Sequence, residues 1–243
     1  MKYLIFNLKG TKTYDEITEY LNNITNLKID EKHLKFIISP ANIYLPLFKN
    51  SNLTLSTQDI NIYENLELTG DTSIKALKSL GVSYTLIGHY ERKKYYQETE
   101  YQIINKIKTA LRNNLKVIYF IGETKEELMR KVEYQVLERS LAKILNNLNQ
   151  KDFQNIIIAY EPCYMIGTNS PLNTSNIREK INFIKTLIQD YYHENLKVIY
   201  GGNITPENIH ELTKIKELDG YIISSSILDI KNANKIINYL NNN

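Results

Sequence analysis

Short apolar runs alternate with longer amphipathic runs eight times along these 243 residues, and this repeat constrains the fold more than any other feature. The short runs are rich in β-branched residues, as in Ile156–Ala159, which is typical of strands buried on both faces. Strands that alternate with helices pair in parallel through right-handed crossovers. Eight such units in about 250 residues predict a single (β/α)8 TIM-type barrel, an α/β fold of eight parallel strands with outer helices, over residues 1–243.

The boundaries of the repeats follow from the same patterns. The expected strands are Tyr3–Phe6, Lys35–Ile38, Leu53–Ser56, Tyr84–Ile87, Val117–Phe120, Ile156–Ala159, Val198–Tyr200 and Tyr221–Ile223. The expected helices are Tyr14–Asn22, Asn42–Phe48, Ser73–Leu80, Glu98–Asn113, Lys125–Asn146, Ser175–Tyr192, Pro206–Thr213 and Lys231–Leu240. An open doubly wound sheet is the alternative. It would usually have a glycine-rich fingerprint after the first strand, and Asn7-Leu8-Lys9-Gly10 is not one.

Several helix ends are predicted from single residues. Thr174 and Ser175 are expected to cap the helix that follows them. Thr205 is expected to cap a helix with Pro206 at its first position, where a missing N–H costs nothing. Gly81 can take the left-handed conformation that ends a helix.

Composition and charge exclude several classes of function. The net charge of +3 is spread along the chain, and basic residues stand beside acidic ones on the expected helix faces, which favours solvated helices over a nucleic-acid surface. No run approaches the ~20 apolar residues of a membrane span, and Met1–Leu8 is too short for a signal-peptide core. The one cysteine, Cys163, allows no internal disulfide and is expected to have a packing role. We therefore expect a cytoplasmic protein with no nucleic-acid or membrane partner.

The stretch from Ile156 to Asn169 holds the first candidate for chemistry. Its buried strand ends on a carboxylate, Glu161, and Pro162 stops the strand there. A mostly uncharged loop around Gly167 follows. This arrangement suits a general base under a lid, and it equally suits a solvated glutamate at a strand end.

In a barrel, the carboxyl ends of all strands share one face, so this arrangement brings distant residues together. That face would carry Asn7 and Lys9, the run Gly88–Arg92, Gly122-Glu123, Glu161, Gly201-Gly202-Asn203 and Ser224-Ser225-Ser226. One carboxylate, one imidazole and one ammonium would meet there. The last two turns present backbone N–H groups, which favour anions and above all phosphate.

In chain order, these motifs resemble the triosephosphate isomerase family over nearly the whole sequence. The matching segments are Asn7-Leu8-Lys9, Thr69-Gly70-Asp71, Leu86–Arg92, Ile121-Gly122-Glu123, Ala159–Pro162 with Ile166-Gly167-Thr168, Tyr200-Gly201-Gly202 and Asp219-Gly220-Tyr221. Each segment alone is weakly specific, and the ordered set is strongly specific. The resemblance implies an aldose–ketose isomerase of glycolysis, gluconeogenesis and the pentose shunt.

The resemblance also implies a mechanism that interconverts dihydroxyacetone phosphate and D-glyceraldehyde 3-phosphate through an enediol. Glu161 would be the base, and His89 a neutral N–H donor to the substrate oxygens. Lys9 would stabilise the developing negative charge and Asn7 would add a hydrogen bond. Glu91 is expected to hold the Lys9 ammonium in an ion pair.

The remaining implications concern the phosphate, the lid and the partner. Backbone N–H groups of Gly167, Asn203, Ser224 and Ser225 would bind the phosphate, and the lid from Pro162 to about Pro171 would close over it. No cofactor and no metal are implied. A homodimer is expected through the Asn61–Thr72 loop, where apolar Leu66 and Leu68 favour a buried interface.

Six positions depart from the family pattern. Tyr90 replaces the usual Ser after the catalytic His, Tyr164 replaces a Trp at the first lid hinge, and Asn203 replaces a Ser. Ser224-Ser225 replaces a Gly-Gly pair, and Asn169 stands at a glycine-like lid position. The two serines narrow the phosphate site while adding hydroxyl donors. None of the departures removes a catalytic group, and together they make a slower enzyme plausible.

The other histidines and two further charged residues have no predicted catalytic role. His33, His193 and His210 are assigned no role, and Arg92 and Asp71 are expected to form a structural or interface ion pair. One alternative function is another phosphate-binding barrel enzyme, such as a Schiff-base aldolase. The other is a sugar-phosphate-binding barrel with little or no catalysis.

Overall fold

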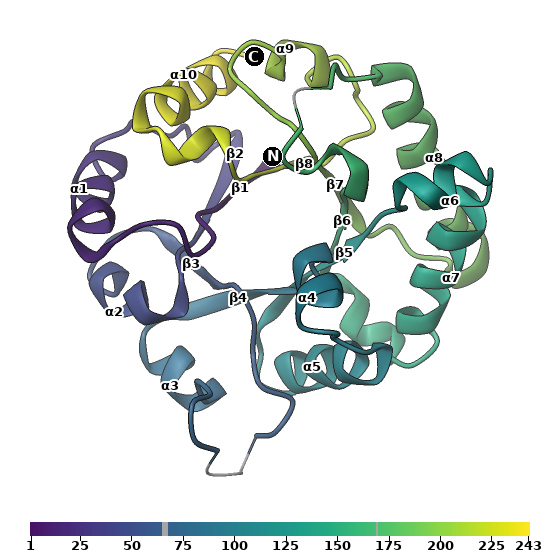
Figure 1. Ribbon diagram of the computed structural model, residues 1–243, viewed down its shortest axis with the longest axis horizontal. Coiled ribbons are helices and arrows are strands. Elements are labelled where there is room, and N and C mark those ends of the chain that lie inside the picture. The colour runs from purple at the N-terminus through teal and green to yellow at the C-terminus, as the bar shows by residue number, and fades with distance from the viewer. Residues whose placement is uncertain (65–67, 169) are drawn as a thin grey trace.

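The computed structural model of the chain describes residues 1–64, 68–168 and 170–243. Eight parallel strands pair in chain order, and β8 returns to pair with β1, so the sheet closes into a barrel with helices around it (Figure 1). The predicted closed barrel is confirmed. Within the described ranges, no helix is both long enough and apolar enough to cross a membrane.

The strands are short and follow the predicted runs within one or two residues at most ends. They are β1 Lys2–Asn7, β2 Leu34–Ser39, β3 Thr54–Thr57, β4 Val82–Ile87, β5 Lys116–Ile121, β6 Ile156–Tyr160, β7 Lys197–Gly201 and β8 Gly220–Ile223. Their parallel registers, such as Asn7 opposite Ser39, bring all the carboxyl ends to one mouth.

The helices are more broken than the sequence pattern suggests. The α-helices are α1 Tyr14–Ile24, α2 Leu45–Phe48, α3 Ile74–Ser79, α4 Tyr90–Tyr95, α5 Glu100–Arg112, α6 Lys125–Met129, α7 Glu133–Leu145, α8 Thr174–Tyr192, α9 Ile209–Leu212 and α10 Ile230–Asn241. Short 3-10 turns are η1 Asn42–Tyr44, η2 Gln150–Asn155, η3 Cys163–Met165 and η4 Ser226–Leu228.

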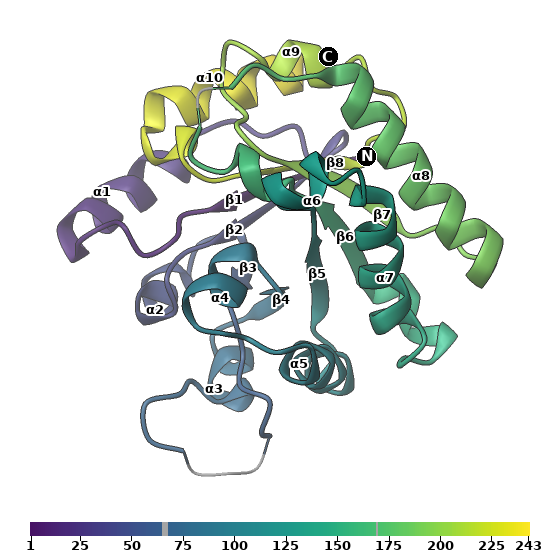
Figure 2. The same ribbon diagram turned by 45° about the vertical axis from the view of Figure 1, so that its right-hand side comes forward.

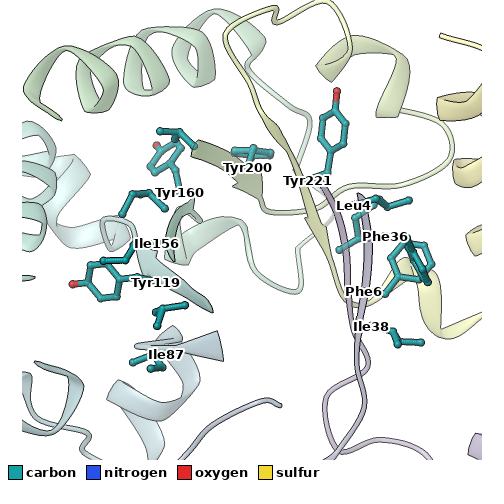
Figure 3. Close-up of a cluster of buried hydrophobic side chains, with 14 of the residues drawn as sticks. Leu4, Phe6, Phe36, Ile38, Ile87, Tyr119, Ile156, Tyr160, Tyr200 and Tyr221 are labelled. Atoms are coloured by element: carbon teal, nitrogen blue, oxygen red, sulfur yellow. The ribbon is translucent and has the colours of Figure 1, made fainter. Parts of the chain in front are cut away.

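Two apolar layers hold the barrel together. The inner layer fills the barrel itself with one face of every strand except β3, and its buried members are Ile5, Ile37, Tyr84, Leu86, Ile118, Phe120, Ile157, Ala159, Ile199 and Ile222. The outer layer lies between the barrel and the helices (Figure 3). Phe6 and Phe36 meet edge to face there at 5.0 Å, and Tyr160 and Tyr200 lie 6.0 Å apart. Alternate residues of each strand thus face opposite layers, which fixes the side chains that reach the mouth.

Three helix boundaries differ from those expected. The single helix expected over Lys125–Asn146 is two helices, because Lys131 has φ 58° and breaks the ladder between α6 and α7. Asn173 caps α8 instead of Thr174 or Ser175, and its side chain accepts a hydrogen bond from the backbone N–H of Asn176 at 3.0 Å. The helix expected to start at Pro206 begins in α9 only at Ile209.

The expected left-handed residue after α3 is present, since Gly81 has φ 82°. Arg92 and Asp71, expected to form a structural or interface ion pair, do not pair within the chain. Arg92 Nε lies 2.7 Å from Asp59 Oδ2 instead, because α4 directs the guanidinium toward the loop after β3. Asp71 accepts a hydrogen bond from the Asn61 side chain within its own loop.

Candidate active site

The mouth of the barrel holds a cavity of about 360 Å³ between the lid and the loops after β7 and β8. It is lined by Lys9, Glu161, Ile166–Thr168, Gly202–Thr205 and Ile222–Ser226. A second cavity of about 310 Å³ includes Asn7, Lys9, Gln58, His89 and Glu91. Lys9 lines both, so the nine sequence-predicted site residues gather around two adjoining cavities.

Glu161 and His89 face each other at this mouth. His89 Nε2 lies 3.3 Å from Glu161 Oε2, and the two residues are only 6% and 8% exposed. The rings of His89 and Phe120 pack edge to face, with their centroids 4.9 Å apart and an angle of 81° between their planes. Gly201 leaves the room that the carboxylate occupies, because a Cβ there would stand 2.9 Å from Glu161 Oε1. Burial on this scale keeps both groups away from bulk water.

The hydrogen bond at the other ring nitrogen determines the tautomer of His89. His89 caps α4, and its Nδ1 accepts a hydrogen bond from the backbone N–H of Glu91 at 3.2 Å. In a neutral imidazole, the second nitrogen then carries the proton. Nε2 is therefore an N–H donor directed at the mouth. Within the described residues, neither His89 Nε2 nor Glu161 Oε2 makes a well-aligned hydrogen bond, so both are free for a ligand.

Lys9 has a strained backbone that several neighbours maintain. Its φ is 52°, a left-handed value that is uncommon for a residue with a side chain. Asn7 Oδ1 accepts from the Lys9 N–H at 3.1 Å, and Gln58 Nε2 donates to the Lys9 carbonyl oxygen at 2.8 Å. Lys9 Nζ lies 2.5 Å from Glu91 Oε1, so the expected ion pair is present. Gln58 could not be identified from the sequence, because nothing local indicates that a residue directly after β3 supports Lys9 after β1.

The lid is tied to the loop after β7. Asn203 Nδ2 donates to the carbonyl oxygen of Ser170 at 2.7 Å, across the outer edge of the cavity. Asn203 has φ 45°, which asparagine tolerates better than most residues, and Asn208 Nδ2 donates to its carbonyl oxygen. Gly167, with φ 68°, forms the turn of the lid. Asn169 lies outside the described residues.

The loop after β8 leads Ser224 and Ser225 into the 3-10 turn η4 at the cavity wall. The hydroxyl of Ser226 donates to the carbonyl oxygen of Ile204 at 2.6 Å and holds this loop against the one after β7. Among the described residues, no group of three or more His, Cys, Asp or Glu side chains is placed to hold a metal ion.

Glu123 connects the barrel to the first residues of the lid. It is fully buried, and its Oε1 accepts from the hydroxyls of Tyr160 at 3.0 Å and Tyr164 at 3.5 Å. Its carbonyl oxygen accepts from the Cys163 N–H at 2.9 Å. Burial raises the pKa of Glu123, and the Tyr160 hydroxyl and Lys180 ammonium offset that rise only in part. Burial also raises the pKa of Cys163 to about 12, which disfavours a thiolate.

Substitution of Glu123 by Gln should change how stability depends on pH. A carboxyl with a raised pKa in the folded state contributes stability below its ordinary pKa and loses it as pH rises through the raised value. Gln cannot ionise, so the stability of the native chain relative to Glu123→Gln should fall as pH rises from below 4.5 to neutral. Urea unfolding at several pH values measures this, and a difference that stays constant with pH would contradict it.

The Asn61–Thr72 loop extends away from the barrel on either side of residues 65–67 (Figure 2). Tyr63 is 50% exposed and Leu68 is 41% exposed on this loop. Leu66, expected to share the interface, lies outside the described residues. Apolar side chains on a projecting segment are typical of a surface that another chain covers.

Comparisons with known proteins agree on one family. The sequence profile of the family described as triosephosphate isomerase matches residues 2–240. The triosephosphate isomerase of Clostridium botulinum (strain Langeland) is 32% identical over 241 residues, which cover 96% of this chain and 97% of that protein. The triosephosphate isomerase of Mycoplasmoides gallisepticum is 32% identical, over 94% of this chain and 94% of that protein. The triosephosphate isomerase of Blochmanniella floridana is 33% identical, over 98% of this chain and 95% of that protein.

Proposed function

Because this chain belongs to the triosephosphate isomerase family, we propose that it interconverts dihydroxyacetone phosphate and D-glyceraldehyde 3-phosphate through an enediol. We further propose that residues 1–243 act as one catalytic barrel and that the protein serves glycolysis, gluconeogenesis and the pentose shunt in the cytoplasm. The observation that carries the proposal is the meeting of Glu161, His89 and Lys9 from β6, β4 and β1 at one mouth.

Glu161 is the base of the proposed reaction. Its carboxylate takes the proton from the carbon next to the carbonyl and returns it to the neighbouring carbon. A carboxylate is a weak base in water, so the reaction depends on a site that excludes water and holds the carbon acid in line. The burial of Glu161 and the room that Gly201 leaves for it support this role.

Three donors stabilise the negative charge that develops on the substrate oxygens. The Nε2–H of His89 reaches the oxygens from beside the base, and its neutral tautomer is supported by the bond from Glu91 N to Nδ1. Lys9 supplies a positive charge held in place by Glu91, and the Asn7 amide adds a hydrogen bond. Preorganised donors need not reorganise during the reaction, which is why they lower its barrier.

The substrate phosphate binds at the opposite end of the cavity, against the lid and the last two loops. Backbone N–H groups of Gly167, Asn203, Ser224 and Ser225 are the proposed donors. The two serine hydroxyls stand where the family usually has glycines and can add donors of their own. Binding energy from the phosphate end then holds the triose in register with Glu161.

The direct test is an isomerase assay of the purified chain with D-glyceraldehyde 3-phosphate, with dihydroxyacetone phosphate followed by a coupled reductase. The proposal requires saturable turnover. Tight binding of 2-phosphoglycolate without turnover would instead indicate a sugar-phosphate-binding barrel. A Schiff-base aldolase needs a neutral lysine, and the 2.5 Å pair of Lys9 with Glu91 stabilises the charged form. Borohydride trapping of an adduct on Lys9 would contradict this reading.

Substitution of Asn203 by Ala should weaken lid closure. The variant loses the hydrogen bond to the Ser170 carbonyl oxygen, and one such bond corresponds to about a two- to tenfold fall in kcat/KM. Loss of phosphate from the intermediate should rise, as measured by inorganic phosphate released during turnover. Ser170→Ala is the matched control, because the bond uses the backbone of Ser170. Equal effects of the two variants would contradict the role of Asn203.

We also propose a homodimer through the Asn61–Thr72 loop. The exposed Tyr63 and Leu68 support it, as does Tyr96, which is 70% exposed although it lines the cavity beside Lys9. A partner's loop would cover this cavity and complete the site. Sedimentation at micromolar concentration should give the mass of two chains, and a monomeric mass would contradict the proposal.

A further inference from the structure

A third cavity, also with the size of a ligand site, lies outside the barrel wall. Its volume is about 510 Å³, within the range of about 300–1,000 Å³ that small-molecule sites occupy. Its lining comes mainly from α4, α5, α6 and α7 and from the carboxyl half of β5. Glu161 lines this cavity as well as the one at the mouth, so the two share a wall at the proposed base.

The walls of this outer cavity are largely apolar and partly aromatic. Ile103 of α5, Tyr119 and Phe120 of β5, and Val136 and Ile144 of α7 all line it. The Tyr119 hydroxyl is occupied, since it donates to the carbonyl oxygen of Ser140 at 3.3 Å. The interior therefore favours a compact apolar body with a flat face.

The carboxylates around the outer cavity, other than Glu161, already have partners. Glu98 Oε1 lies 2.5 Å from Lys106 Nζ, and Glu100 pairs with Lys143. Glu127 accepts from the backbone N–H of Thr124 at 2.8 Å in a capping box. These groups are held at the protein's own contacts and do not neutralise a further cation.

Lys93 and Lys94 are the cations in the lining of this cavity that have no carboxylate partner in the described chain, and Lys93 is the less exposed of the two. Its Nζ donates to the carbonyl oxygen of Phe120 at 3.3 Å, and no carboxylate of the described chain lies within ion-pair distance of it. Burial lowers the pKa of Lys93, the expected effect on an ammonium removed from water without a counter-charge. Lys94 also lines the cavity, but its side chain is exposed to solvent and its Nζ lies over the Tyr95 ring at 5.0 Å.

We propose that the outer cavity binds a small aromatic monocarboxylate, with the carboxylate paired to Lys93 and the ring against Tyr119 and Phe120. One negative charge fits better than two, because Lys94 is exposed, which leaves Lys93 as the less exposed unpaired ammonium of the described lining, and Glu161 would repel a second charge. Through the shared wall, the occupant contacts Glu161 and lowers its turnover. This last clause rests on the proposed isomerase function, whereas the binding itself does not.

Binding is tested by isothermal titration of the native protein with 1-naphthoate, and with 1-naphthamide as its uncharged counterpart. The naphthoate should bind saturably and at least about tenfold more tightly than the amide, the effect of one hydrogen bond to a charged group. A saturating amount of 2-phosphoglycolate should leave the naphthoate bound. Equal affinity for the two probes, or displacement of naphthoate by 2-phosphoglycolate, would overturn the proposal.

Two matched variants test whether the Lys93 ammonium binds the carboxylate of naphthoate. Lys93→Met should weaken naphthoate binding at least about tenfold and leave amide binding unchanged. Lys94→Met, which changes the exposed neighbour, should alter the affinity for naphthoate less than about twofold. Equal losses in the two variants would overturn the assignment. If Lys93→Met does not fold, the comparison of the two probes on native protein still decides the matter. Val136→Phe should reduce binding of both probes by narrowing the cavity.

An activity assay tests separately whether a ligand in the outer cavity lowers turnover by Glu161. Naphthoate should lower kcat with little change in KM, and Lys93→Met should remove that inhibition while keeping native turnover without naphthoate. Naphthoate binding with no effect on kcat would overturn the link to Glu161 and leave the binding site standing. Binding in a chain that has no isomerase activity would contradict the proposed function alone.

Discussion

Replacement of Glu161 by Gln is expected to lower kcat by about 10²- to 10⁴-fold, the range for loss of a positioned general base. The amide keeps the size of the carboxylate and fits the space beside Gly201, but it cannot accept the proton. KM should change little, because the groups that bind the phosphate remain. Steady-state assays with D-glyceraldehyde 3-phosphate measure both constants.

Two further variants separate chemistry from folding at this position. Glu161→Asp keeps a carboxylate but withdraws it by one methylene, so its kcat should lie between those of the native chain and Glu161→Gln. Glu207→Gln changes an exposed carboxylate after β7 and should leave kcat unchanged. Native-like kcat in Glu161→Gln, with unchanged thermal stability, would exclude Glu161 as the base.

Replacement of Lys106 by Met should cost up to about 3–5 kcal/mol of unfolding free energy, because it leaves Glu98 and Asp59 with Arg92 as their one cation within ion-pair distance among the described residues. Lys106 Nζ lies 2.5 Å from Glu98 Oε1 and 2.6 Å from Asp59 Oδ2, and the Glu98 side chain is 2% exposed. Burial raises the pKa of Asp59, so the cluster is already costly to ionise. Urea denaturation at neutral pH measures the loss.

The control for Lys106→Met is a pair on the surface. Arg130 and Glu126 lie 2.6 Å apart with about two-thirds of each side chain exposed, so Arg130→Met should cost less than about 1 kcal/mol. The deficit of Lys106→Met should shrink as pH falls toward the raised pKa of Asp59, because the stranded carboxyl then takes up a proton. Similar losses in the two variants would contradict the account of the cluster.

The barrel could be predicted from the sequence because each strand has its own apolar run and each run ends on a distinct polar residue. Glu161 illustrates this: the strand parity that buries Ile157 and Ala159 inside the barrel also directs position 161 to its mouth. The gathering of Asn7, Lys9 and His89 with Glu161 then follows from closure alone.

Features that depend on contacts between distant segments could not be predicted in this way. Helix α4 was missed because Tyr90–Tyr95 has no apolar stripe, and its first turn is fixed by His89 acting as a cap. Lys131 gave no signal of a break, since glycine or asparagine usually takes a left-handed conformation. Gln58 supports Lys9 across 49 positions of sequence, a link that no local pattern encodes.

The pairing of β1 with β8 also has a consequence for how the chain is made. One edge of β1 pairs with β2, but the partners of its other edge are residues 220–223, which are made much later. While the ribosome is still producing the middle of the protein, β1 has an open edge that another nascent chain could pair with. Contacts so distant in sequence also slow folding. The emergence of β8 therefore decides when this edge of the barrel is protected from aggregation.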